Sequence, residues 1–90
     1  MADLHLNVNG EYFHEIKAGI KPFEFRLEEK WLKRLEGKTF DRILIKWGYP
    51  KRDDKDRILE RPWRGFERHV ITHKHFGVEP KRVCAIRVND

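Results

Sequence analysis

The sequence has a single cysteine, Cys84, and no long apolar segment. One thiol cannot close an internal disulfide or build a cysteine-based zinc cage, which excludes a disulfide-stapled secreted domain and that kind of metal site. The longest uninterrupted apolar run, Val83 to Ile86, is far shorter than the roughly 20 residues of a membrane span. The first residues also lack the charged and apolar regions of a signal peptide. We therefore expect a cytoplasmic protein with no membrane partner.

Internal repeats and low-complexity tracts are absent as well, and 90 residues allow one compact domain over 1–90. Apolar and charged residues each make up 39% of the chain, so a thin core must draw on the aromatic 12%. Residues 1–29 hold three Lys/Arg against six Asp/Glu, whereas residues 30–90 hold seventeen against nine. This asymmetry, with a net charge of +5, favours a polyanionic partner, nucleic acid before membrane, over a merely solvated basic surface.

The hydrophobic pattern predicts two short helices and five or six strands. Asn9 is expected to cap a helix that ends at Gly19, although Asn9 and Gly10 could instead turn a hairpin. A second helix is expected over 29–36, with Gly37 as its stop. Alternating or continuous apolar residues predict strands over 4–8, 23–27, 40–47, 58–63, 66–73 and 83–88.

These elements indicate an α+β fold. With so many strands in so few residues, we expect the sheet to curl into a small barrel, open or closed, with the two helices near the N-terminus covering one opening. The most apolar strand, 40–47, is expected at the centre of the sheet. Trp47 and Cys84 are expected in the core.

The densest group of chemically capable residues lies at 19–26. Gly19 ends the first helix, and Lys21 follows it just before the next strand. The aromatic face of that strand is expected to be buried, and Glu24 and Arg26 share its other face. A lysine, a carboxylate and a guanidinium in one cleft can bind phosphate and transfer a proton. The alternative is a salt bridge on a solvated sheet face.

The spacing Gly-x-Lys-x-x-Glu-x-Arg, present as Gly19, Lys21, Glu24 and Arg26, resembles the motif of the ASCH domain superfamily. The resemblance extends over most of the chain, which is similar to the small phage and bacterial members of the superfamily. It includes Trp31, Arg34, Gly37, Asp41, the Gly48-Tyr49 turn and the segment Arg64-Gly65-Phe66. The resemblance implies a PUA-like β-barrel with a cleft lined by the motif side chains.

The resemblance also implies that this cleft binds RNA or a modified nucleotide. Some family members deacetylate N4-acetylcytidine and others cleave RNA, so a hydrolase is the alternative function. In that case Lys21 would polarise or deprotonate a reacting group, and Glu24 would act as the general acid or base. In the amidohydrolase members the lysine acts with a threonine and a glutamate. Here Glu24 stands at the threonine position, and Glu67 is the candidate glutamate. No cofactor is expected, apart from a divalent metal if the protein is a nuclease. A third hypothesis is that the protein is a small regulator that binds another protein.

Aromatic and basic residues around the cleft are expected to stack on bases and contact phosphates. The stacking candidates are Tyr49, Trp31 and Trp63. The candidates for binding through charge are Arg26, Arg34, Lys46, Lys51, Arg52, Arg61, Arg64 and Arg68.

No metal site is expected. His69 and His73 on one strand would lie roughly 13 Å apart, too far to share a metal. His73 and His75 would need further ligands, such as Glu67 or His5, to complete a zinc site. The acidic run over 53–56 lacks the glycine and the distal glutamate of a calcium loop.

Overall fold

The computed structural model describes residues 2–72 and 77–89, and this part of the chain contains six strands and two α-helices. In chain order they are β1 (Asp3–Val8), α1 (Gly10–Lys17), β2 (Phe23–Leu27), α2 (Glu28–Leu35), β3 (Arg42–Trp47), β4 (Ile58–Arg61), β5 (Phe66–Ile71) and β6 (Lys81–Arg87), with a 3-10 turn at Lys55–Arg57 before β4. Each predicted helix and strand is present. Of the predicted fifth strand, His73 lies outside the described residues.

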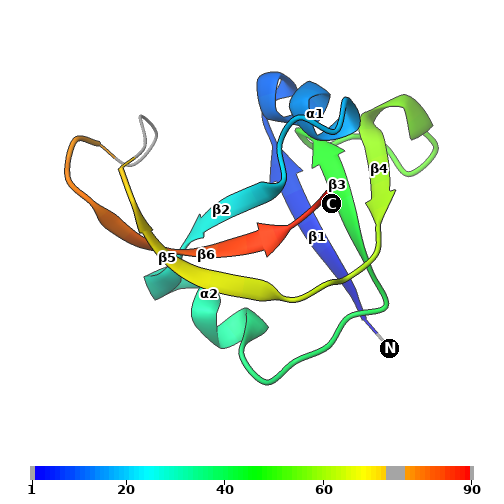
Figure 1. The fold of residues 1–90 in the computed structure, drawn as a ribbon. Helices are drawn as coiled ribbons and strands as arrows, with labels where there is room; N and C mark the ends of the chain where they lie inside the picture. Colours follow the sequence, from blue (N-terminus) through cyan, green and yellow to red (C-terminus); the bar gives the residue numbers. More distant parts are fainter. Residues whose placement is uncertain (1, 73–76, 90) are drawn as a thin grey trace.

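The strands form two three-stranded sheets. One has the order β1-β3-β4, with β1 parallel and β4 antiparallel to β3, and the other is the antiparallel sheet β2-β6-β5 (Figure 1). The strand β3 is central in its sheet, as predicted. We expected a small barrel, open or closed, and a closed barrel is not found among the described strands, because β1 and β2 are sheet edges that no backbone pairing joins.

The core lies between the two sheets, and the helices cover its two ends (Figure 1). Leu6, Ile43 and Ile45 come from one sheet and meet Cys84 and Ile86 of the other, and all five are fully buried. The helices add Phe13, Ile16 and Leu35. Burying one such side chain stabilises the fold by about 1.5–3 kcal/mol. Cys84 is therefore a core residue, as predicted.

Local capping explains where α1 begins. The Oδ1 of Asn9 accepts a hydrogen bond from the Tyr12 N–H at 2.9 Å, which satisfies one of the free donors of the first turn. The helix prediction is therefore confirmed over the hairpin. Neither described helix is long and apolar enough to cross a bilayer.

The orientation of β2 is the opposite of the prediction. Glu24 is only 5% exposed and pairs with the core residue Ile86, whereas Phe23 and Phe25 are half-buried on the other face with ring centroids 6.4 Å apart. The expectation of a buried aromatic face was wrong because it treated Glu24 as a charge that needs water. Its carboxylate is instead neutralised by Arg26 at 2.8 Å.

Candidate functional site

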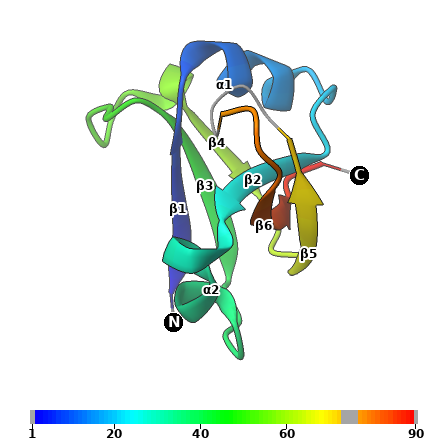
Figure 2. The same cartoon turned by 90° about the vertical axis from the view of Figure 1, so that its left-hand side faces the viewer.

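A cavity of about 300 Å³ lies where the edges of β1 and β2 approach each other between α1 and α2. Figure 2 shows the two strands side by side, with α1 at one end and α2 at the other. The lining residues are Asn7, Asn9, Tyr12, Lys21, Glu24, Phe25, Arg26, Leu27, Lys30 and Trp31. The volume is at the lower end of the range for small-ligand pockets.

Arg26 joins the two sheets in the wall of this cavity. Its Nη2 donates to Glu24 Oε2 at 2.8 Å and to the carbonyl oxygen of Asn7 on β1 at 2.8 Å. The Nε of Arg26 is buried and has no hydrogen-bond partner within the described part of the chain. Buried donors without a hydrogen-bond partner are rare in folded proteins, so packing alone does not explain why the Arg26 guanidinium lies here.

The backbone of Lys21 is fixed from both sides. The helix α1 ends in a Schellman motif in which Gly19 has φ +78° and donates its N–H to the carbonyl of Ile16 at 3.1 Å. The side chain of Asn89, from the C-terminal end of the chain, donates to the Lys21 carbonyl at 2.8 Å. These bonds hold the segment that connects α1 to β2 over the cavity.

The side chain of Lys21 is only 12% exposed, and its ammonium lies among polarizable and anionic groups. The Nζ is 3.9 Å from Glu24 Oε1, 4.8 Å from the ring centroid of Tyr12 and 5.0 Å from that of Phe25. Cation–π contacts of this kind strengthen when water is excluded. Glu24 is thus held between two cations, Lys21 and Arg26.

Tyr12 contributes a neutral phenol. Burial raises its pKa above the ordinary 10.0, and the nearby carboxylates of Glu11, Glu24 and Glu15 raise it further. At neutral pH the hydroxyl is therefore protonated and able to donate a hydrogen bond.

Trp31 of α2 forms part of the opposite wall. Its ring contacts two guanidinium groups, with Arg26 Cζ at 5.1 Å and Arg34 Cζ at 4.9 Å from the ring centroid. Arg34 lies one helical turn beyond Trp31, which explains this contact. Arg34 itself does not line the cavity.

The lining combines charge with aromatic surface. It contains three cations (Lys21, Arg26 and Lys30) and one carboxylate (Glu24), a net charge of +2. Tyr12, Phe25 and Trp31 supply aromatic walls. The cavity can therefore hold an anionic ligand that carries a flat ring.

Several predicted binding residues are not brought into this cavity. Tyr49 and Lys51 lie on the exposed loop between β3 and β4, and Arg64 lines a separate pocket with Arg61 and Asn89. Of the other tryptophans, Trp63 packs edge to face on Phe40 at 4.9 Å, and Trp47 packs against the core as predicted.

Other predicted contacts are occupied by protein groups. Arg68 bonds both carboxylate oxygens of Glu28, at 2.8 and 3.2 Å. Glu67, the candidate second glutamate, lies on β5, where it contacts His69 at 3.1 Å and Arg87 at 3.6 Å and does not line the cavity. Residues 73 and 75 lie outside the described residues. The described residues contain no group of three or more side chains suited to hold a metal ion.

Sequence reasoning missed part of the lining: Asn7, Asn9, Tyr12, Phe25, Leu27 and Lys30. Asn9 is expected to cap a helix or to turn a hairpin, and neither role places it at a cavity. The cavity's position on the edge of β1 depends on how the two sheets are placed, and no local pattern carries that information.

Comparisons of the chain with protein-family models, curated proteins and solved structures give no match. The resemblance to ASCH domains therefore remains a prediction that depends on the motif residues. The function must be argued from the chemistry of the cavity.

Proposed function

We propose that this chain binds single-stranded RNA and holds one nucleotide, natural or modified, in the cavity between β1 and β2. The observation that carries the proposal is the ion pair between the buried Glu24 and the half-buried Arg26 in the wall of an aromatic-lined cavity beside Lys21.

The lining matches the parts of a nucleotide. Cations at Lys21, Arg26 and Lys30 suit a phosphate group, and aromatic rings suit the face of a base. A carboxylate such as Glu24 accepts a hydrogen bond from an exocyclic amino group, which allows one base edge to be preferred. Binding a phosphate group and recognising a base both proceed without a bound cofactor.

Stability alone is a weak explanation for the buried pair. An ion pair removed from water is often no more stabilising than apolar side chains of similar volume. Here the pair also lines a cavity and leaves the Nε of Arg26 without a hydrogen bond in the described part of the chain. Ligand recognition gives a reason for both features.

The test measures the affinity of a fluorescently labelled, mixed-sequence RNA by anisotropy over a range of salt concentrations. Lys21→Ala and Glu24→Gln are compared with Lys33→Ala, which removes an exposed lysine of α2 outside the cavity. Losing a hydrogen bond to a charged group is expected to weaken binding by about tenfold or more. Thermal unfolding checks that each variant is folded. Equal affinity of all three variants and the wild type would refute the proposal.

A hydrolase in the same cavity is the second candidate. It is favoured by the presence of an ammonium and a carboxylate, Lys21 and Glu24, in one cavity wall, since these groups can act as acid and base on a bound substrate. Incubation with RNA and with N4-acetylcytidine, with and without Mg²⁺ or Mn²⁺, would be read by mass spectrometry. A product that disappears in both Lys21→Ala and Glu24→Gln would establish an enzyme. Salt-sensitive RNA binding without product would leave a binding module.

The proposal includes kinship with ASCH domains and a cytoplasmic location, where RNA is available. The competing hypothesis is a small protein-binding regulator. A protein partner whose affinity is unchanged in Lys21→Ala would favour that hypothesis over the cavity.

A further inference from the structure

The edge of the cavity is tied to a solvent-exposed turn through one residue, Asn7. Its carbonyl oxygen accepts from Arg26 in the cavity wall, and its Nδ2 donates to the carbonyl of Gly48 at 2.6 Å. The Gly48 N–H in turn donates to Val8 at 3.0 Å. The turn that follows β3 is therefore fixed to the strand that borders the cavity.

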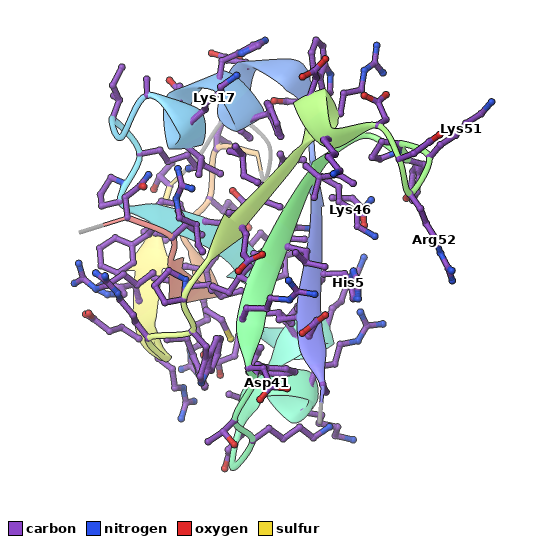
Figure 3. The ribbon with its side chains drawn as sticks, turned by 90° about the vertical axis from the view of Figure 1, so that its right-hand side faces the viewer. His5, Lys17, Asp41, Lys46, Lys51 and Arg52 are labelled. Atoms are coloured by element: carbon purple, nitrogen blue, oxygen red, sulfur yellow. The ribbon has the colours of Figure 1, made fainter. Side chains whose placement is uncertain are left out.

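Beyond this edge, the neighbouring sheet face carries three cations that make no ion pair within the part of the chain that the structure describes. Lys46 is the register partner of Asn7, so the two side chains share the outer face of the β1-β3-β4 sheet. The segment 46–52 holds Lys46, Lys51 and Arg52 and no acidic residue. None of the three cations has an ion pair or side-chain hydrogen bond within residues 2–72 and 77–89. Figure 3 shows them toward one end of this face.

The acidic residues near this surface are mostly engaged elsewhere. Asp3 and Glu60 both contact Arg42, at 3.3 and 2.8 Å. Asp41 lies at the far end of the face in Figure 3. In the loop itself Asp54 pairs with Arg57 at 3.7 Å. Two further acids, at positions 53 and 56, follow the three cations in sequence, so the segment without acidic residues is 46–52.

An aromatic residue, Tyr49, lies between these cations in the sequence. Tyr49 is 93% exposed, so its ring contributes little to the packing of the core. Only 39% of the chain is apolar, and an exposed large aromatic side chain therefore calls for another explanation. The loop around it is held in shape: Arg57 lies 4.6 Å over the Trp47 ring, and the Asp54 N–H donates to the Lys51 carbonyl at 3.0 Å. Tyr49 is thus exposed on a turn whose backbone is held in place, in the same segment as the three cations.

We infer that Lys46, Tyr49, Lys51 and Arg52 form a second nucleotide subsite, which receives the part of an RNA strand that leaves the cavity across Asn7. This inference rests on the proposed function and adds that the ligand is an oligonucleotide rather than a free nucleotide. Tyrosine stacks on one base, and the cations contact the flanking phosphates. Exposed aromatic rings beside basic residues are the usual means of binding single strands without strict sequence preference.

The test compares ligands of increasing length. Cytidine 5′-monophosphate, a trinucleotide and a hexanucleotide of cytidine compete with a labelled RNA for the wild type, Tyr49→Ala and the double variant Lys51→Ala/Arg52→Ala. The double variant Lys33→Ala/Lys38→Ala is the matched control, because it removes two exposed lysines outside both subsites.

For the wild type we expect the hexanucleotide to bind at least tenfold more tightly than the monophosphate. Tyr49→Ala should remove most of that gain, because stacking on one base is worth about 1–3 kcal/mol, a factor of roughly 5–150. Losing Lys51 and Arg52 should lower the slope of log K against log salt by about 1.4 for the hexanucleotide. Monophosphate binding should be unchanged in these variants.

The outcomes separate the two proposals. If the monophosphate binds but the length dependence is the same in Tyr49→Ala and in the control, the second subsite is refuted and the cavity proposal stands. If Tyr49→Ala weakens the monophosphate as much as the hexanucleotide, the loop only shapes the cavity and the subsite is likewise refuted. If no RNA binds the wild type, both proposals fail.

Discussion

Replacing Arg26 by methionine removes the donor that holds Glu24 inside the protein. The substitution deletes the 2.8 Å bonds to Glu24 Oε2 and to the Asn7 carbonyl but keeps a side chain of similar length. Glu24, whose side chain is only 7% exposed, then still has the Lys21 ammonium at 3.9 Å as a counter-charge. We expect the fold to lose stability, because the carboxylate loses the 2.8 Å hydrogen bond from Arg26 in a place with little water.

The expected size follows from the burial of the pair. Breaking a buried ion pair by removing one partner costs about 3–5 kcal/mol. The side chain of Arg26 is 20% exposed and Lys21 supplies part of the compensation, so we expect about 2–4 kcal/mol for Arg26→Met. Small domains are stable by only about 5–15 kcal/mol, so this is a large fraction of the total.

Urea unfolding followed by circular dichroism measures the loss directly. Arg42→Met is the matched control, since Arg42 also contacts two carboxylates, Asp3 and Glu60, but its side chain is 44% exposed. Its unfolding midpoint should barely change, because exposed ion pairs contribute little.

A double variant, Glu24→Leu with Arg26→Met, tests the cause. If the uncompensated charge is what destabilises Arg26→Met, removing Glu24 as well should recover part of the loss, with a coupling energy of at least about 1 kcal/mol. Additive losses, or an Arg26→Met variant as stable as Arg42→Met, would refute the claim that the pair is buried and mutually dependent.

Two pH-dependent effects follow from other contacts. The pKa of Glu28 lies below its ordinary 4.5 because Arg68 donates hydrogen bonds to it, so the stability this contact gives is present above the unfolded pKa and is lost as pH falls through the folded one. The fall in thermal midpoint from about pH 6 to about pH 3 should therefore be smaller in Arg68→Ala than in the wild type, and an equal fall would count against the contact. In Tyr49→Phe, where Tyr12 is the remaining tyrosine, ultraviolet titration should show phenolate forming above pH 10, because burial and nearby carboxylates raise the pKa of Tyr12. Adding Glu24→Gln should lower that midpoint, and a midpoint that stays fixed would exclude Glu24 as a cause.

The helices and strands could be predicted because their signals are local. Asn9 caps α1, Gly19 and Gly37 adopt positive φ after the two helices, and strand periodicity marks the sheets. The placement of Cys84 in the core also followed from its apolar neighbours. How strands pair across the chain is not local information, and the two separate sheets, with β1 parallel to β3, were not predicted.

The orientation of β2 shows the limit of hydropathy. Apolar residues were expected inward and charged residues outward, yet Glu24 is the most buried residue of this strand. Its burial depends on Arg26, which in turn depends on a carbonyl of β1. A pattern within one strand cannot reveal a partner supplied by another element.

The site was predicted in part for the same reason. Lys21, Glu24 and Arg26 are close in sequence and all line the cavity, as does Trp31. Other lining residues come from β1 and from α1 with its cap, and the sequence could not place these elements beside β2. Residues chosen for their chemistry alone, such as Tyr49 and Arg64, lie elsewhere on the surface.

The claim that the cavity receives a nucleotide can be tested most directly through the tryptophan indole signals in a two-dimensional NMR titration with single-stranded RNA. The chain has three tryptophans, and their indole signals would be assigned with single Trp→Phe variants. Trp31 lines the cavity, whereas Trp63 packs on Phe40 away from it. The account predicts that the Trp31 indole signal shifts in a saturable way while that of Trp63 does not. RNA binding that shifts Trp63, or that leaves Trp31 unchanged, would contradict it.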